Sequence, residues 1–257
     1  KDGSSRAITG LPINPKIQHV SWSPDATRFA FTLDQEDHIE LWLADIATAS
    51  AKRLIQSNMN AIFGSPYSWM SDSLRLLVKA VPDSREPAPQ EPVVPLGPVI
   101  QESTGRPAAA RTYQDLMVNG YDEDLFEHYG QVQLLMVDVS GFVQELGMPD
   151  LIRRAVPSPG ADHLLVETVQ RPFSYLVPQY RFPHRLEVWD SSGDLLKEIA
   201  SLPLAEEVPI GRGAVPTGPR SMNWRADAPA TLFWVEARDG GDPRADTDVR
   251  DALLTLS

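Results

Sequence analysis

The sequence of 257 residues predicts an all-β fold, namely a partial β-propeller with a Pro-rich and helical insertion. Three observations support this prediction. A strand-turn-strand phrase recurs four times, each copy is followed by further strand sequence, and apolar and polar residues alternate along the strands. A unit of four antiparallel strands cannot bury both of its faces alone, so successive units must stack around an axis as the blades of a propeller do.

The recurring phrase surrounds a tight turn. Its clearest copy is Val20–Asp25 (VSWSPD), which is followed by the apolar strand Arg28–Phe31. Proline presets φ for such a turn, and the aspartate side chain can accept a hydrogen bond from the backbone two residues further on. The other copies begin at Tyr67, Val156 and Met222.

Alternation along the predicted strands indicates which face each side chain occupies. In the second copy, Leu74, Leu76 and Val78 are expected on one face of the strand, with Arg75 and Lys79 on the other. The second half of each repeat supplies further strands, which are predicted at Ile39–Asp45 with Lys52–Leu54, Gln133–Asp138 with Val143–Leu146, Arg185–Asp190 with Leu195–Ile199, and Ala252–Leu256.

These repeats divide the chain into roughly three full and two partial blades. We predict the end of a preceding blade in residues 1–18, followed by complete blades in residues 19–63, 64–152 and 153–203 and a truncated blade in residues 220–257. Because propellers usually contain about four to eight blades, we expect the chain to be a piece of a larger propeller.

Three segments interrupt the repeats, and long ordered insertions in compact folds are often functional. The insertion 82–130 is rich in proline from Pro82 to Pro107, which predicts an extended surface segment. Its second half, Thr112–Tyr129, has helical spacing of apolar residues, with Asn119 and the following glycine as a kink or break. The other two are the loop 170–183, inside the third blade, and the Gly- and Pro-rich segment Leu202–Pro219, which is predicted as a loop.

Composition excludes several functional classes. With 23 basic and 35 acidic residues the formal charge is −12, which argues against nucleic acid or an anionic membrane surface as a partner. The chain has no cysteine, no apolar run long enough for a transmembrane helix, no paired histidines at metal-binding spacing and no Gly-x-Ser-x-Gly turn. We therefore predict no metal site, no cofactor and no catalytic residue in this chain.

The loop 170–183, with the strand residues that follow it, carries the candidate binding residues. It brings arginines and aromatic residues together in an acidic chain, and arginine can bind a carboxylate with two parallel hydrogen bonds. Two interpretations are open: the loop forms a recognition surface, or its aromatic residues fasten it to the propeller and its arginines pair with neighbouring acids. The candidate substrate-binding residues are Arg171, Tyr175, Arg181 and Arg185.

Several segments of the chain carry a resemblance to a known family. They are Ile8–Pro12, Trp22–Asp25, Gly97–Glu102, Arg111–Leu116, Arg171–Pro178, Arg220 and Trp224–Ala230. With these segments the chain resembles, over nearly its whole length, the propeller of the prolyl-oligopeptidase clan of serine peptidases, and more narrowly its glutamyl endopeptidase branch. The Trp-Ser-Pro-Asp motif is common among propellers, whereas the arginine-aromatic loop and the Arg-Thr-Tyr-Gln-Asp-Leu motif are more specific.

The resemblance implies a function that this chain shares with a catalytic domain located elsewhere. Members of the family carry an N-terminal propeller, which caps the active site and filters substrates by size, and a C-terminal α/β-hydrolase domain with a Ser-Asp-His triad. The implied partners are a peptide or protein substrate, the α/β-hydrolase domain and the remaining blades. The implied compartment is the bacterial periplasm or the plastid stroma, and Arg171, Arg181 and Arg185 are candidates for contacting a glutamyl substrate.

A second function from another class is also consistent with the sequence. The chain could be a non-catalytic scaffold that binds a protein or peptide partner through its proline-rich insertion and its arginine-aromatic loop. The two hypotheses differ in what would follow Ser257, since the peptidase hypothesis requires further blades and then a Gly-x-Ser-x-Gly turn.

Overall fold

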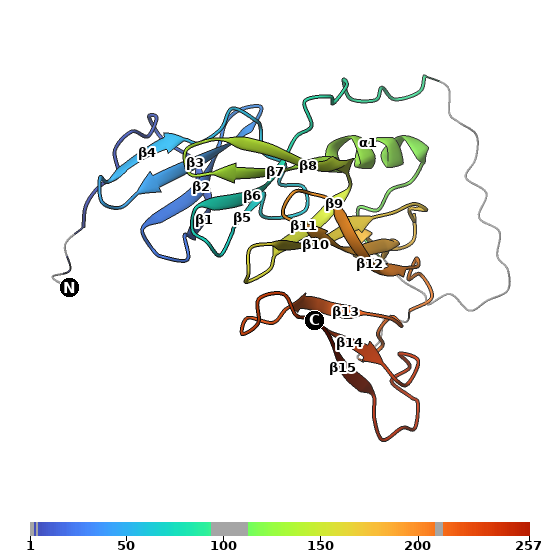
Figure 1. Ribbon diagram of the computed structural model, residues 1–257. Coiled ribbons are helices and arrows are strands. Elements are labelled where there is room, and N and C mark those ends of the chain that lie inside the picture. Colours follow the sequence, from blue (N-terminus) through green and yellow to red (C-terminus); the bar gives the residue numbers. More distant parts are fainter. Residues whose placement is uncertain (1–2, 4, 94–112, 209–212) are drawn as a thin grey trace.

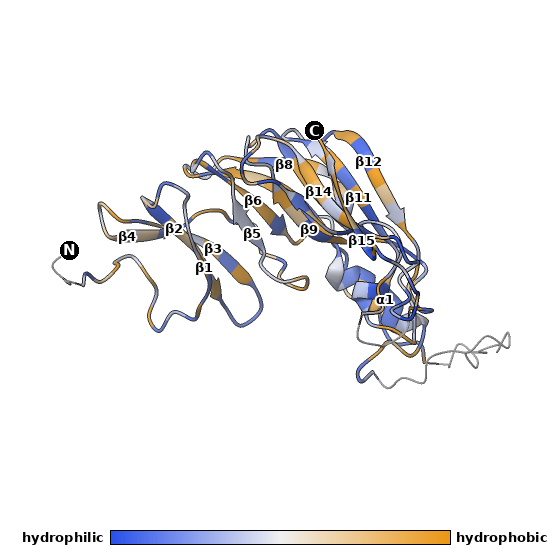
Figure 2. Ribbon diagram, turned by 90° about the horizontal axis from the view of Figure 1, so that it is seen from below, coloured by the Kyte–Doolittle hydropathy of each residue, from blue (hydrophilic) through white to orange (hydrophobic). Residues whose placement is uncertain are grey.

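The computed structural model describes residues 3, 5–93, 113–208 and 213–257 and contains four antiparallel sheets. The sheets follow one another along an arc in chain order (Figure 1). Figure 2 shows the later sheets stacked face to face. Within each sheet, every strand pairs with its neighbour in the sequence. The predicted all-β propeller architecture is therefore confirmed.

The first two sheets each contain four strands. The first sheet is formed by β1 (Ile17–Trp22), β2 (Arg28–Asp34), β3 (Ile39–Asp45) and β4 (Ser50–Arg53). The second is formed by β5 (Tyr67–Trp69), β6 (Arg75–Ala80), β7 (Val132–Asp138) and β8 (Val143–Asp150).

The third sheet again has four strands, and the fourth has three in the described part of the chain. The third sheet is formed by β9 (Ile152–Pro157), β10 (His163–Val169), β11 (His184–Asp190) and β12 (Leu195–Leu202). The fourth is formed by β13 (Arg220–Trp224), β14 (Leu232–Ala237) and β15 (Asp251–Leu256).

The four turns that revealed the repeat share one backbone hydrogen bond. In the first sheet, the Ser23 amide donates to the Arg28 carbonyl at 2.9 Å. The corresponding bonds measure 2.8 Å in the other three sheets and join Met70 to Arg75, Ser158 to His163, and Arg225 to Thr231. The repeat seen in the sequence is thus a repeat of hairpin geometry.

The central strands are buried on both faces because each inner sheet lies between two others. On β6, Leu76 and Val78 pack toward the first sheet, and Leu77 packs toward the third. Lys79, which was expected on the face opposite Leu76 and Val78, is only 7% exposed. A strand covered on both sides has no solvent-facing positions for its polar residues.

The helix in the insertion is shorter than predicted. It is α1 (Gly120–Gly130), and the described residues 113–119 before it are not helical. Asn119 is the N-cap, because its side chain accepts a hydrogen bond from the Asp122 amide at 3.0 Å. The Asn-Gly pair, which was expected to kink or break the helix, therefore starts it. Thr112 and the matching segment Gly97–Glu102 lie outside the described residues.

Neighbouring sheets are joined by equivalent tryptophan side chains. The indole Nε1 of Trp69 in the second sheet donates to the Ser21 carbonyl of the first at 3.2 Å. In the same way, Nε1 of Trp224 in the fourth sheet donates to the Val156 carbonyl of the third at 2.9 Å. Each bond runs from the first strand of one sheet to the first strand of the preceding sheet, and it helps to fix how these sheets pack.

Replacing Trp224 with phenylalanine should destabilise the contact between the third and fourth sheets. The change removes the indole donor and part of a ring that is only 7% exposed, so the free energy of unfolding should fall by about 1 to 2 kcal/mol. Urea unfolding of the 257-residue chain measures this. The matched control is Trp22→Phe, because Trp22 is 57% exposed and the change should cost about 0.5 kcal/mol or less. Equal losses for the two variants would contradict the prediction.

Candidate functional site

The loop 170–183 is folded back against helix α1. The Gln170 amide donates to the Pro183 carbonyl at 2.7 Å, which closes the base of the loop between β10 and β11. Phe173 and Phe182 are buried and meet Phe126 of the helix, with ring centroids 5.0 and 5.8 Å from that ring. The aromatic residues of the loop therefore fasten it to the body of the protein.

Arg171 and Tyr175 reinforce this contact through two acidic residues of α1. The Arg171 guanidinium donates to Glu127 at 2.7 Å and also to Glu123, and it lies 4.6 Å from the centre of the Phe173 ring. The Tyr175 hydroxyl donates to Glu123 at 2.6 Å, and this bond to a carboxylate raises the pKa of Tyr175 to about 12. Both side chains hold the loop on the helix.

The other two predicted residues, Arg185 and Arg181, have different surroundings. Arg185 lies on β11, where it pairs with Glu187 at 2.8 Å and with Asp150 at 3.5 Å. Arg181 lies in a short 3-10 helix, Gln179–Arg181, and donates to the carbonyls of Ala205 and Val208 at 3.2 and 2.6 Å. Of the four candidates, Arg181 alone lines a large cavity in the described part of the chain.

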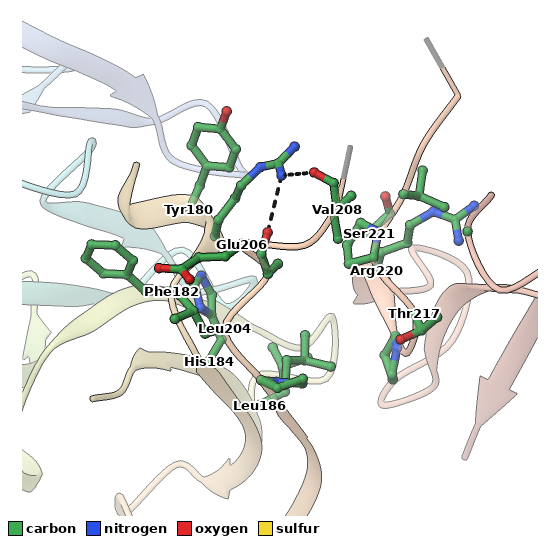
Figure 3. Close-up of a pocket in the computed structure, with 18 of the residues that line it drawn as sticks. Tyr180, Phe182, His184, Leu186, Leu204, Glu206, Val208, Thr217, Arg220 and Ser221 are labelled. Carbon is green, nitrogen blue, oxygen red and sulfur yellow. Dashed lines mark hydrogen bonds between the residues drawn. The ribbon is translucent and has the colours of Figure 1, made fainter. Parts of the chain in front are cut away.

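That cavity has a volume of about 1000 Å³ and lies between the third and fourth sheets (Figure 3). Its apolar wall includes Phe182, Leu186 and Leu204. Arginines line it from both sheets and from the connecting loops, namely Arg153, Arg154, Arg181, Arg220 and Arg244. The carboxylates that line it are Glu167, Glu206, Glu207 and Asp242.

A buried acid–base cluster forms part of the cavity wall. His184 is only 5% exposed, and its Nε2 lies 3.6 Å from Oε1 of Glu167. Arg153 donates to the same carboxylate oxygen at 2.5 Å. Burial lowers the pKa of His184, and the nearby Glu167 carboxylate opposes this effect only in part. We therefore expect His184 to be neutral near pH 7.

Sequence reasoning missed most of the cavity. Arg153 and Arg154 are adjacent on β9, and alternation alone would place them on opposite faces of the strand, yet both line the cavity. The sequence signal that could have pointed to the cavity is the pair of adjacent arginines, Arg153 and Arg154, in an acidic chain. Arg220 was noted only as a matching residue, although it stands at the start of the equivalent first strand of the fourth sheet, β13.

Other kinds of site are not found where the structure describes the chain. In residues 3, 5–93, 113–208 and 213–257, no group of three or more His, Asp or Glu side chains could hold a metal ion. In the same ranges, no helix combines the length and the apolar character needed to cross a bilayer.

Comparison with known sequences identifies close relatives. No protein-family profile matches the chain. A probable chloroplastic glutamyl endopeptidase of Oryza sativa subsp. japonica is 39% identical over 261 residues, which cover 98% of this chain and 28% of the relative. The probable chloroplastic glutamyl endopeptidase of Arabidopsis thaliana is 40% identical, with 98% and 27% coverage. The chain thus spans little more than a quarter of the length of these relatives.

The solved structures that match have lower sequence identity to this chain. An acylaminoacyl peptidase of Pyrococcus horikoshii has 17% identity and a TM-score of 0.46, and the match covers 85% of this chain and 28% of that one. The tricorn protease has 12% identity and a TM-score of 0.44, with 94% and 17% coverage. The family assignment rests on the sequence relatives. They identify this chain as a β-propeller segment related to the glutamyl endopeptidases.

Proposed function

We propose that this chain is the part of a serine endopeptidase propeller that gates peptide substrates, and that the complete enzyme cleaves after glutamate. The observation that carries the proposal is the identity of 39 to 40% with two glutamyl endopeptidases along 98% of the chain. The sequence has no Gly-x-Ser-x-Gly turn, so hydrolysis would require an α/β-hydrolase domain outside these 257 residues.

The structure supports a gating role through the shape of the segment. Three four-stranded sheets and a fourth sheet of three strands form a curved wall. Buried apolar clusters join each sheet to the next. A wall of this kind excludes bulky substrates from a chamber while leaving short peptides free to enter. The proposed partners are therefore peptides, the catalytic domain and the remaining blades. The chloroplast location in both relatives' names is compatible with the plastid stroma.

The complete protein that contains this chain provides the test. Its kcat/KM is measured on two amidated peptides that differ only in glutamate or glutamine before the scissile bond, and on a folded protein with exposed glutamates. We expect a preference of about 100-fold or more for the glutamyl peptide, because a site built for a carboxylate rejects its amide analogue, and no cleavage of the folded protein. The 257-residue chain alone should be inactive.

Other results would contradict the proposal in distinct ways. Equal cleavage of the two peptides would contradict the proposed specificity for glutamate. Rapid cleavage of the folded protein would contradict the proposed gating role. No hydrolysis by the complete protein would favour the non-catalytic scaffold.

A further inference from the structure

We infer that the cavity between the third and fourth sheets binds the carboxylate of an acidic peptide side chain through Arg154 and Arg181. The inference rests on the proposed function only in taking a peptide as the ligand. The binding chemistry follows from the arginines that line the cavity.

Two guanidinium groups at the cavity retain uncompensated charge. Arg181 donates to the carbonyls of Ala205 and Val208, as the dashed lines in Figure 3 show, and Arg154 donates to the Met222 carbonyl at 2.8 Å. In the described part of the chain, neither side chain has a carboxylate within ion-pair distance. A carbonyl satisfies a donor without neutralising the cation, and a guanidinium has five N–H donors, so both arginines can still bind an anion.

The other three arginines that line the cavity each pair with a carboxylate. Arg153 is neutralised by Glu167, and Arg244 pairs with Asp242 at 3.1 Å. Arg220 donates through Nη2 to Asp251, yet its buried Nη1 has no hydrogen-bond partner in the described structure. Arg220 is therefore neutralised by Asp251 and keeps one buried donor without a partner.

A second orphaned group lies in the same wall. The Nε2 atom of His184 is buried and has no hydrogen-bond partner among the described residues, while the residue itself is 5% exposed. Figure 3 shows His184 and Arg220 among the residues that line the cavity, on strands of different sheets. A buried polar atom without a partner destabilises the fold, so this part of the cavity wall is unfavourable as it stands.

The size and charge of the cavity fit a short peptide. About 1000 Å³ is at the upper end of ordinary ligand sites, and the apolar wall can cover the stem of a glutamate while guanidinium groups bind its carboxylate. The protein carries a net charge of −12, so it does not attract acidic peptides in general. Binding of such a peptide would have to come from this local cluster.

Glu206 and Glu207 line the same cavity and oppose an anionic ligand. Glu206 is held by the Ser174 hydroxyl, which donates to its carboxylate at 2.5 Å, and an amide at this position could accept the same bond. The variant Glu206→Gln should therefore bind an acidic peptide more tightly, by about threefold to tenfold. A merely structural role for the cavity would not give this gain.

The test is equilibrium binding of fluorescent peptides to the 257-residue chain, followed by anisotropy. Three acetylated peptides are compared: one with an internal glutamate and an amidated end, its glutamine analogue, and the glutamine analogue with a free carboxyl end. We expect the glutamate peptide to bind at least about tenfold more tightly than its glutamine analogue. The third peptide tells whether a terminal carboxylate can replace the side chain.

Variants locate the binding to the cavity. Arg181→Gln and Arg154→Gln should each weaken binding of the glutamate peptide by about tenfold, with little change for the glutamine peptide. Arg154→Gln leaves the Arg181 bonds to the 205–208 backbone intact, so it serves if Arg181→Gln disturbs that loop. The control is Arg28→Gln, whose arginine pairs with Asp45 in the first sheet. Equal binding of the two amidated peptides, or unchanged binding by both cavity variants, would overturn the inference.

The two proposals can fail separately. If the chain binds the glutamate peptide but the complete protein does not cleave after glutamate, the proposed function fails and the carboxylate site stands. If the complete protein cleaves after glutamate and both cavity variants bind normally, the function stands and the carboxylate site fails.

Discussion

Replacing Phe182 with alanine is expected to lower the free energy of unfolding by about 3 to 5 kcal/mol. Phe182 is 3% exposed, and its ring centre lies 5.4 Å from that of Phe173 and 5.8 Å from that of Phe126. Deleting it leaves a cavity that two aromatic neighbours on separate insertions cannot both fill. Urea unfolding of the 257-residue chain gives the stability, and hydrogen exchange on α1 should show faster opening of the helix.

A nearby exposed residue provides the control for this prediction. Leu176 lies in the same loop and is 49% exposed, so Leu176→Ala should cost about 1 kcal/mol or less. If Phe182→Ala costs no more than Leu176→Ala, the aromatic cluster does not hold the loop on the helix.

Replacing Lys79 with methionine is expected to raise stability at pH 7 by about 1 to 2 kcal/mol. The Lys79 ammonium is buried, donates to the Phe63 carbonyl at 3.1 Å, and has no carboxylate within ion-pair distance in the described residues. Burial lowers the pKa of Lys79 from 10.5 to about 8. Methionine fills a similar volume without a charge, although it leaves the Phe63 carbonyl without this donor, which reduces the gain.

The sign of the pH dependence follows from this lowered pKa. Below pH 8 both the folded and the unfolded states carry the proton, so the wild type bears the full cost of the buried charge. Between pH 8 and 10.5 the folded state loses the proton first, so the wild type gains stability relative to the methionine variant. The advantage of Lys79→Met should therefore shrink across this range.

Urea unfolding at pH 7 and pH 9.5 checks this, with Lys52→Met as the control. Lys52 is an exposed lysine on β4, so its replacement should change stability by about 0.5 kcal/mol or less at either pH. A pH-independent difference between the wild type and Lys79→Met would show that the charge of Lys79 is not what destabilises the fold.

The repeats were predictable from sequence because their signals are local. The turn at Ser23 and its three equivalents combine proline, aspartate or glycine with alternating strands, and each turn needs only its own residues to form. The start of α1 also depends on a local signal, namely the N-cap residue Asn119. Its capping role was missed because the apolar spacing appeared to continue upstream of it.

The burial of Lys79 and the arginine-lined cavity could not be predicted in the same way. Whether a strand has a solvent-facing side depends on which sheets cover it, and this is a property of the assembled arc. The cavity joins Arg154 of one sheet to Arg220 of the next and to Arg181 of a loop. The arginine-aromatic loop was singled out correctly as unusual, but sequence could not tell that Arg171 faces two glutamates of α1 while Arg181 faces the cavity.

The contact between α1 and the loop 170–183 has a mechanical consequence. It joins an insertion of the second blade to an insertion of the third, at a distance from the sheet faces where those blades already pack. Two separate points of attachment resist twisting, whereas the third and fourth blades have no helix of this kind between them in the described residues. Bending between the third and fourth blades should therefore be easier than bending between the second and third. The cavity lies between the third and fourth blades, so a bound ligand there would restrict this bending.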